Sequence, residues 1–288
     1  MDNYLLKNDE NYFLLNLMSF YQEYLPDNSV KQFIKCYWIY ENKGDELSED
    51  IVTHNGCSNI VFTIYGTITE QGPNYLRSLP KTFVFPAGHR PSKFSYEKLK
   101  CVGIRLQPWA NLTFIKSFFF DQVNEVVDIK EYYNNKLAGM VDNGQHKTNE
   151  QIIDLVESLS LELIKFQRSI DQPFKDVIHK IIETKGELSI ETICRVLRLT
   201  QRGLELKFQK NVGSSPKFFL QKIRFHNFLR SALACQNSDL TQLALNTGYY
   251  DQSHLIRASK KFTGLSPSRL VPILTASNGL NKKVNFSF

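Results

Sequence analysis

Cysteine is scarce and scattered along this chain of 288 residues. The five cysteines are Cys36, Cys57, Cys101, Cys194 and Cys235, an odd number with no CxxC pair and no Cys/His spacing. This pattern excludes a disulfide framework and a clustered zinc site, and it is typical of a reducing compartment. We therefore expect a cytoplasmic protein.

Long apolar runs are also missing. No stretch of about 18 consecutive apolar residues occurs, so no membrane-spanning helix is predicted. The first 15 residues are acidic and lack the basic region with which a signal peptide begins. The sequence thus predicts neither a membrane span nor a secretion signal.

The motifs of common enzyme classes are absent as well. The chain has no GxSxG, no P-loop and no GxGxxG motif. A cupin-like metal enzyme would need clustered imidazoles and a carboxylate, yet residues 30–120 hold only His54 and His89, without an HxH pair. Cys57 has two interpretations, a reactive thiol or an ordinary small residue near a turn. We predict no catalytic residue, no metal ligand, no cofactor and no enzyme activity.

What the chain does contain is a charge asymmetry. Residues 172–288 carry 18 Lys and Arg against 7 Asp and Glu, whereas residues 1–171 carry 17 against 22. A basic part joined to a mildly acidic part is typical of a polyanion-binding module attached to a second domain. Solvated lysines would give the same count, so the charge needs a structural pattern beside it.

Residues 30–120 have the composition of β-strands. Runs such as KQFIKCYWIYE and SNIVFTIYGTITE are β-branched and aromatic, and Gly and Pro turns separate them. Strands at this spacing predict an antiparallel β barrel or sandwich, of the cupin-like kind and with helices, within residues 1–170. Residues 112–120 fit either a strand or a helix. The predicted fold class is α+β with more than one domain.

Residues 150–170 predict one amphipathic helix. Its apolar residues recur at alternating steps of four and three, as in the seam of a coiled coil. They are Ile152, Val156, Leu159, Leu163, Phe166 and Ile170. The stripe has two interpretations: it packs on the helix's own domain, or it forms a homodimer.

The remainder of the chain predicts an all-helical domain. We place its boundary at residues 171–174, where DQPF interrupts the pattern, the domain itself at 171–272, and a flexible tail at 273–288. Short turns join the predicted helices. The expected caps, stops and helix starts are Thr200, Gly213, Pro216, Asp251 and Gly264.

The pattern Gly-x-Ser-Pro occurs twice, at 213–216 and at 264–267, which is a spacing of 51 residues. Taken alone, each copy is a common joint between two helices. The same shift, however, superimposes Thr200 on Asp251, Leu204 on Leu255, Lys210 on Lys261, and Pro216 on Pro267. Each unit is predicted to be a short helix, a tight turn and a capped second helix. The sequence therefore predicts a helix-turn-helix motif that occurs twice.

The helix predicted between the two units runs from Pro216 to Ala234. Its 19 residues span about 28 Å at 1.5 Å per residue. One turn of B-DNA advances roughly 34 Å. A rod of this length can hold two recognition helices over successive major-groove segments on one face of the DNA.

Residues 172–270 resemble the DNA-binding domain of AraC/XylS-type transcription regulators. The second unit, LALNTGYYDQSHLIRASKKFTGLSPSRL, carries the resemblance most fully. It departs from the family pattern at Leu255 and Ser259, where the pattern prefers Phe. In the looser first unit, Leu206 stands where the pattern usually has Arg.

The N-terminal half resembles an uncharacterised β-rich domain that often precedes AraC-type DNA-binding domains. This similarity rests on three segments, YLPDNSVKQFIKCYWIYE, THNGCSNIVFTIYG and FVFPAGHRPSKFSYEKLKCVGIRLQPW. The resemblance implies a sensor or dimerisation module, and it names no ligand.

Candidate DNA-contacting residues follow from the helix positions. The base-reading candidates lie in the first two turns of each second helix: Gln201, Arg202, Glu205, Gln252, Ser253 and Arg257. A second helix cap is the alternative for Ser253, and a phosphate contact or a helix brace is the alternative for Arg202. Because Leu206 replaces a cation, we expect fewer base contacts from the first unit. The phosphate candidates are Lys207, Lys210, Arg224, Lys260 and Lys261.

The sequence therefore predicts a sequence-specific, DNA-binding transcription regulator that the N-terminal domain controls. The expected partners are double-stranded DNA, RNA polymerase, a small-molecule effector and a second copy of the chain as a homodimer. The alternative is a small-molecule-binding protein whose DNA-binding domain is weak or vestigial. An enzyme is the third hypothesis, and the missing motifs argue against it.

Overall fold

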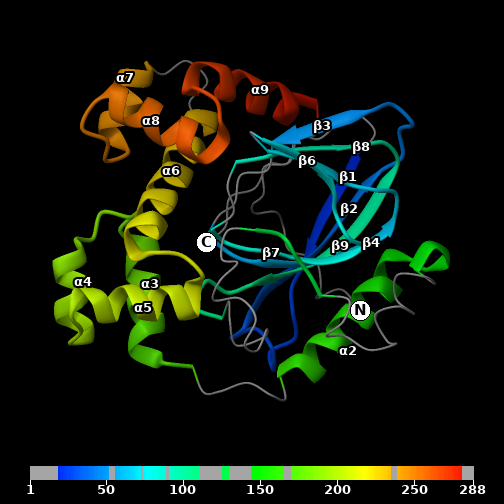
Figure 1. The fold of residues 1–288 in the computed structure, drawn as a ribbon, viewed down its shortest axis with the longest axis horizontal. Coiled ribbons are helices and arrows are strands. Elements are labelled where there is room, and N and C mark those ends of the chain that lie inside the picture. The colour runs from blue at the N-terminus through cyan, green and yellow to red at the C-terminus, as the bar shows by residue number, and fades with distance from the viewer. Residues whose placement is uncertain are drawn as a thin grey trace.

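The computed structural model describes two layers of antiparallel strands followed by helices (Figure 1). The described residues are 19–51, 56–72, 74–88, 91–110, 125–129, 144–164, 170–234 and 239–280. The α+β class with an antiparallel β domain is thus confirmed. Residues 112–120, His54, His89, Phe166 and Cys235, about which the sequence left questions open, lie outside the described residues. Within the described ranges, no helix has both the length and the apolar character needed to cross a membrane.

The β domain consists of two sheets. The larger sheet has the order β1 (Ser19–Tyr24), β2 (Ile34–Asn42), β9 (Leu99–Leu106), β4 (Asn59–Tyr65), β7 (Thr82–Phe85) and β10 (Val127–Asp128). The smaller has the order β3 (Ser48–Ile51), β8 (Lys93–Tyr96), β5 (Thr69–Gly72) and β6 (Tyr75–Ser78). All neighbouring strands in both sheets pair antiparallel.

Strand β2 is buried on both faces because its residues alternate between two cores. Tyr37 and Ile39 point into a cluster shared with helices, whereas Trp38 and Tyr40 point between the two sheets. Trp38 fits only because Gly103 lies opposite on β9, where an added Cβ would come within 2.1 Å of the indole ring. The indole N–H then donates to the side chain of Asn59 over 3.0 Å.

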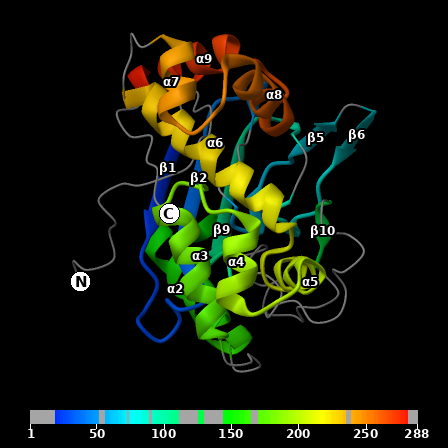
Figure 2. The same ribbon diagram turned by 90° about the vertical axis from the view of Figure 1, so that its left-hand side faces the viewer.

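The rest of the described chain is helical (Figures 1 and 2). A short 3-10 helix, η2 (Gly144–His146), precedes α2 (Asn149–Ile164), which lies beside the larger sheet. The helices that follow are α3 (Gln172–Glu183), α4 (Ile190–Leu197), α5 (Gln201–Val212), α6 (Pro216–Ala234), α7 (Leu240–Asn246), α8 (Gln252–Thr263) and α9 (Pro267–Leu280). Helix α6 runs between the group α3–α5 and the group α7–α9 (Figure 2).

The apolar stripe of α2 packs on the helix's own domain. Ile152 and Val156 are fully buried against the larger sheet, and Leu159 packs against the same cluster. Internal packing, the first of the two interpretations, is therefore confirmed at these positions. The homodimer seam is wrong there, because these side chains are not available to a partner. The side chain of Leu163 lies outside the described residues.

The C-terminal residues differ from the expected flexible tail. Helix α9 continues to Leu280, so the prediction is wrong for residues 273–280. Leu274 is only 3% exposed and belongs to the core of the last three helices. Pro272 lies inside this helix and cannot donate a backbone hydrogen bond one turn back, yet the helix continues beyond it. Residues 281–288 lie outside the described residues.

Candidate nucleic-acid interface

The two predicted helix-turn-helix units have matching ends. The Thr200 hydroxyl accepts a hydrogen bond from the N–H of Gly203 over 3.1 Å and caps α5. The Asp251 carboxylate accepts one from the N–H of His254 over 2.6 Å and caps α8. Both helices end at a glycine in the left-handed region, where other residues are strained. The predicted caps and stops are confirmed.

The interior of each second helix also matches. Leu204 and its counterpart Leu255 are both fully buried. Phe208 is fully buried too, whereas its counterpart is Ser259, the departure from the family pattern. Ser259 is buried without an energetic penalty, because its hydroxyl donates to the carbonyl of Leu265 over 2.7 Å. This serine closes the turn after α8 instead of filling the core.

All six base-reading candidates are exposed. They are Gln201, Arg202 and Glu205 on α5, and Gln252, Ser253 and Arg257 on α8. Among the described residues, none of these side chains forms a hydrogen bond or ion pair with the rest of the chain. Ser253 therefore does not act as the second cap of α8 in this structure. The six stay predicted base contacts.

The phosphate candidates divide into two sets. Lys210 and Lys260 are exposed side chains. The other three already have contacts within the chain. Lys207 pairs with Asp171, Lys261 donates to Gln221 over 2.8 Å, and Arg224 donates to the carbonyl of Gly186 over 2.8 Å. A phosphate contact from one of these three would have to share or replace the contact shown.

A cationic pocket of about 210 Å³ lies between α6 and α8. It is lined by Gln221, Arg224, Tyr249, His254, Arg257, Ala258, Lys261 and Phe262. Burial lowers the pKa of Lys261, and nearby Lys217 lowers it further. Burial raises the pKa of Tyr249 far above its usual range, so the phenol remains a proton donor. We call this pocket the second groove.

A larger pocket of about 430 Å³ lies on the corresponding side of α5. We call it the first groove. Its lining comes from three parts of the chain: Phe33 and Trp109 of the β domain, Ile170, Asp171 and Phe174 around the start of α3, and Leu199, Gly203, Leu206, Lys207, Lys210 and Asn211 around α5. Although burial raises it, the pKa of Asp171 is held below its usual value by the hydrogen bond from Lys207.

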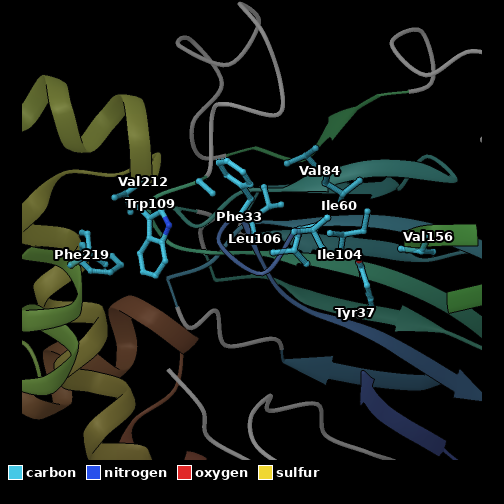
Figure 3. Packing of buried hydrophobic residues seen from close by; sticks show 14 of the residues in the cluster. Phe33, Tyr37, Ile60, Val84, Ile104, Leu106, Trp109, Val156, Val212 and Phe219 are labelled. Atoms are coloured by element: carbon cyan, nitrogen blue, oxygen red, sulfur yellow. The ribbon is translucent and has the colours of Figure 1, made fainter. Parts of the chain in front are cut away.

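The first unit shares its core with the β domain. One cluster of buried apolar residues extends from Ile60 and Ile104 in the sheet, through Trp109, to Val212 and Phe219 (Figure 3). The Trp109 ring lies 4.7 Å from that of His179 on α3. The second unit has a separate core, built from the end of α6 and from α7–α9.

Lys222 on α6 fixes this junction. Its side chain is only 3% exposed, and its ammonium donates to the carbonyl of Ala87 in the β domain over 2.5 Å. Burial lowers the pKa of Lys222 to about 7. Next to it, Cys57 is fully buried, which fits the interpretation of an ordinary small residue near a turn. Among the described residues, no cluster of His, Cys, Asp or Glu could hold a metal ion.

Sequence reasoning did not identify Tyr249, His254 or Lys222 as candidates. The repeat contained a signal for His254, because the face of α8 that carries His254, Arg257 and Lys261 corresponds to the face of α5 that lines the first groove. Lys222 gave no such signal, since its partner Ala87 is 135 residues away.

Comparison with known families agrees with this geometry. Residues 193–271 match a helix-turn-helix domain, and residues 22–128 match a domain of unknown function, DUF6597. The part of the chain from residue 193 to residue 271 is thus a helix-turn-helix domain. More particularly, it is a helix-turn-helix domain of the AraC type, as the resemblance implied.

Solved structures give weaker likenesses. ToxT from Vibrio cholerae is 13% identical with a TM-score of 0.45, over 83% of this chain and 98% of ToxT. The AraC-like activator CuxR is 14% identical with a TM-score of 0.28, over 75% and 87%. A variant of Bacillus subtilis oxalate decarboxylase is 12% identical with a TM-score of 0.25, over 54% and 40%. These scores are too low to support an argument. None of the curated proteins matches the chain.

Proposed function

We propose that this protein is a sequence-specific DNA-binding transcription regulator of the AraC type. One observation carries the proposal: two helix-turn-helix units, 51 residues apart, present the same exposed face of a capped second helix. Folding alone does not require six exposed polar residues at these positions. Recognition of base edges in two major-groove segments does require exposed polar residues at these positions.

The connecting helix supports the spacing of the two readers. Helix α6 has 19 residues, hence about 28 Å of length against roughly 34 Å for one turn of B-DNA. Its amino-terminal half belongs to the core of the first unit and its carboxyl-terminal half to the core of the second. The two units are therefore held on one rod and do not move independently along a flexible linker.

Control of the reader belongs to the N-terminal domain in this proposal. The core shared between the β domain and the first unit would transmit a change in the β domain to α5. The proposal also includes a small-molecule effector, assembly as a homodimer, a contact with RNA polymerase as an activator, and a cytoplasmic location. No part of it requires an enzyme activity or a cofactor.

A small-molecule-binding protein with a weak DNA-binding domain is the second candidate. The first groove favours it, because about 430 Å³ is within the range of ligand pockets and the lining combines aromatic rings with lysines. This function and the first one are compatible if the ligand controls DNA binding.

The test is binding of the full chain to genomic fragments from upstream of its own gene. We expect a footprint over two successive major-groove segments and a binding constant whose logarithm falls linearly with the logarithm of salt concentration. A chain that binds metabolites but shows no salt-dependent DNA binding would support the second candidate and contradict the first.

A further inference from the structure

The two grooves are the same groove of a repeated unit. The same four positions of the repeat line both grooves. In the first groove they are Gly203, Leu206, Lys207 and Lys210. In the second groove, 51 residues later, they are His254, Arg257, Ala258 and Lys261. In both cases the opposite wall is a helix that precedes the helix-turn-helix, α3 in the first and α6 in the second. Differences between the grooves therefore reflect their residues and not their place in the unit.

The first groove contains its own counter-ion. Asp171 pairs with Lys207 there. In the second unit, the counterpart of Asp171 is Lys222, whose side chain instead donates to the carbonyl of Ala87. The counterpart of Lys207 is Ala258, which carries no charge. The internal ion pair of the first groove thus has no equivalent in the second.

Cations dominate the lining of the second groove, which includes no acidic residue. Arg224, Arg257 and Lys261 are joined there by His254. One acidic side chain lies near the groove but outside its lining: a Cβ added at Gly248 would be 3.4 Å from Oε1 of Glu187 and 3.5 Å from Nε of Arg224. Among the described residues, Glu187 and Arg224 do not form an ion pair.

Two buried donors of the second groove lack a hydrogen-bond partner among the described residues: Nε of Arg224 and Oη of Tyr249. Tyr249 is 4% exposed, and the ring of His254 packs edge-on against the Tyr249 ring with 5.2 Å between the ring centroids. Nη2 of the same guanidinium donates to the carbonyl of Gly186 over 2.8 Å, which fixes the position of the Arg224 side chain. A buried donor of this kind normally has an acceptor, because leaving it unpaired is costly.

We propose that the second groove binds a backbone phosphate of the DNA. The inference rests on the proposed function and goes beyond it by naming the site. Tyr249 Oη and Arg224 Nε donate to the phosphate oxygens, and Lys261 and Arg257 supply positive charge at the rim. The volume of about 210 Å³ is below that of pockets for drug-sized ligands but accommodates a tetrahedral oxyanion. The first groove lacks this role because Asp171 pairs with Lys207, one of its two lysines, and leaves only Lys210 unpaired among its described lining residues.

The main test is Tyr249→Phe in the full chain, with Tyr250→Phe as the matched control, since the neighbouring tyrosine is 87% exposed. We expect Tyr249→Phe to weaken binding to the footprinted fragment about 10-fold, as for a lost hydrogen bond to a charged group. Its melting temperature should be unchanged or higher, because the hydroxyl has no partner within the described fold. Tyr250→Phe should bind like the unmodified protein.

Lys261→Gln provides a second measurement, with Lys180→Gln on the exposed side of α3 as its control. The slope of log K against log salt concentration should flatten by about 0.9 in Lys261→Gln. If the unmodified protein binds DNA in a salt-dependent way and Tyr249→Phe binds with equal affinity, the phosphate site in the second groove is wrong. The proposed function would not be affected by that result. If the unmodified protein shows no salt-dependent binding to DNA, that result would instead contradict the proposed function as a DNA-binding regulator.

Inorganic phosphate without DNA distinguishes a free anion from the DNA backbone. If phosphate at millimolar concentration raises the melting temperature of the unmodified protein but not of Tyr249→Phe, while both bind DNA equally, the groove takes a free oxyanion. That outcome would overturn the assignment to DNA. Equal stabilisation of both proteins together with weaker DNA binding by Tyr249→Phe would support the assignment.

Discussion

The two helix-turn-helix units follow one plan but have different neighbours. Both have a capped second helix, a glycine stop and a fully buried leucine at the same position. The first unit, however, shares a continuous core with the β domain, whereas the second is built around its own core. A change in the β domain can therefore reach the first reader through the shared core, and α6, which contributes to both cores, provides a route from there to the second.

The comparison extends to the surface of the readers. At the counterpart of Arg257, α5 carries Leu206, which is 65% exposed. In the groove beside α5, Asp171 pairs with one of two lysines and Trp109 borders the site, while the groove beside α8 has three cations and no acidic residue in its described lining. The second unit has the features of a DNA-binding surface, and the first has those of a surface shared between DNA and the regulatory domain.

Truncation of the paired core leucines should give the largest effects. Leu204→Ala and Leu255→Ala should each cost about 2–5 kcal/mol of unfolding free energy, because both side chains are fully buried. Native-state hydrogen exchange should show lower protection in the sheet only for Leu204→Ala, and in α7–α9 only for Leu255→Ala. Equal loss of protection in the sheet for both variants would contradict the separation of the two cores.

The buried ammonium of Lys222 predicts a pH dependence. Its pKa is about 7 in the folded chain against a usual 10.5, so the folded state binds fewer protons between these values. The cost to stability is complete below about pH 7 and disappears as pH rises towards 10.5, with a slope of up to about 1.4 kcal/mol per unit.

Lys222→Met removes this titration. Denaturant unfolding between pH 7 and pH 9 should therefore show the unmodified protein gaining about 2–3 kcal/mol relative to Lys222→Met. Parallel curves for the two proteins would show that burial of the lysine does not control the junction with the β domain.

The paired glutamines test how specificity is divided. Gln252→Ala should lose about 1–3 kcal/mol of discrimination at one or two base pairs, with almost unchanged affinity for non-specific DNA. Gln201→Ala should lose less, since α5 has Leu206 in place of a cation. Selection of binding sites from random duplexes by each variant measures this. An equal loss from both helices would refute the ranking, and a uniform loss across all sequences would remove Gln252 from the readers.

The paired caps give the smallest expected effect. Thr200→Ala and Asp251→Ala should each cost about 1 kcal/mol of unfolding free energy. Asp251→Ala should cost more, because a carboxylate also interacts favourably with the positive end of the α8 dipole. Thermal unfolding of both variants checks this, with Thr200→Ser and Asp251→Asn as capping-competent controls. A larger loss in Thr200→Ala would contradict the dipole contribution.

The parts of the fold that could be predicted depend on short-range interactions. The hydroxyl of Thr200 and the carboxylate of Asp251 each bond a backbone N–H three residues away, so a short stretch of sequence is enough to reveal them. The alternation of β2 and the helix stops at glycine are equally local. The seam of α2 was ambiguous, because an apolar stripe has the same spacing whether a sheet or a second chain covers it.

The amino-acid sequence by itself determined the two-unit reader, its caps, its exposed polar face and the β-rich first half, since each depends on residues that are neighbours along the chain. Only the tertiary structure decided which unit joins the β domain and which groove keeps its positive charge. Those features depend on Lys222 with Ala87, on Asp171 with Lys207, and on Trp109 beside α3. The partners are 135, 36 and 70 residues apart in the chain, so their contact is set by how the sheet and the helices pack and not by any local pattern.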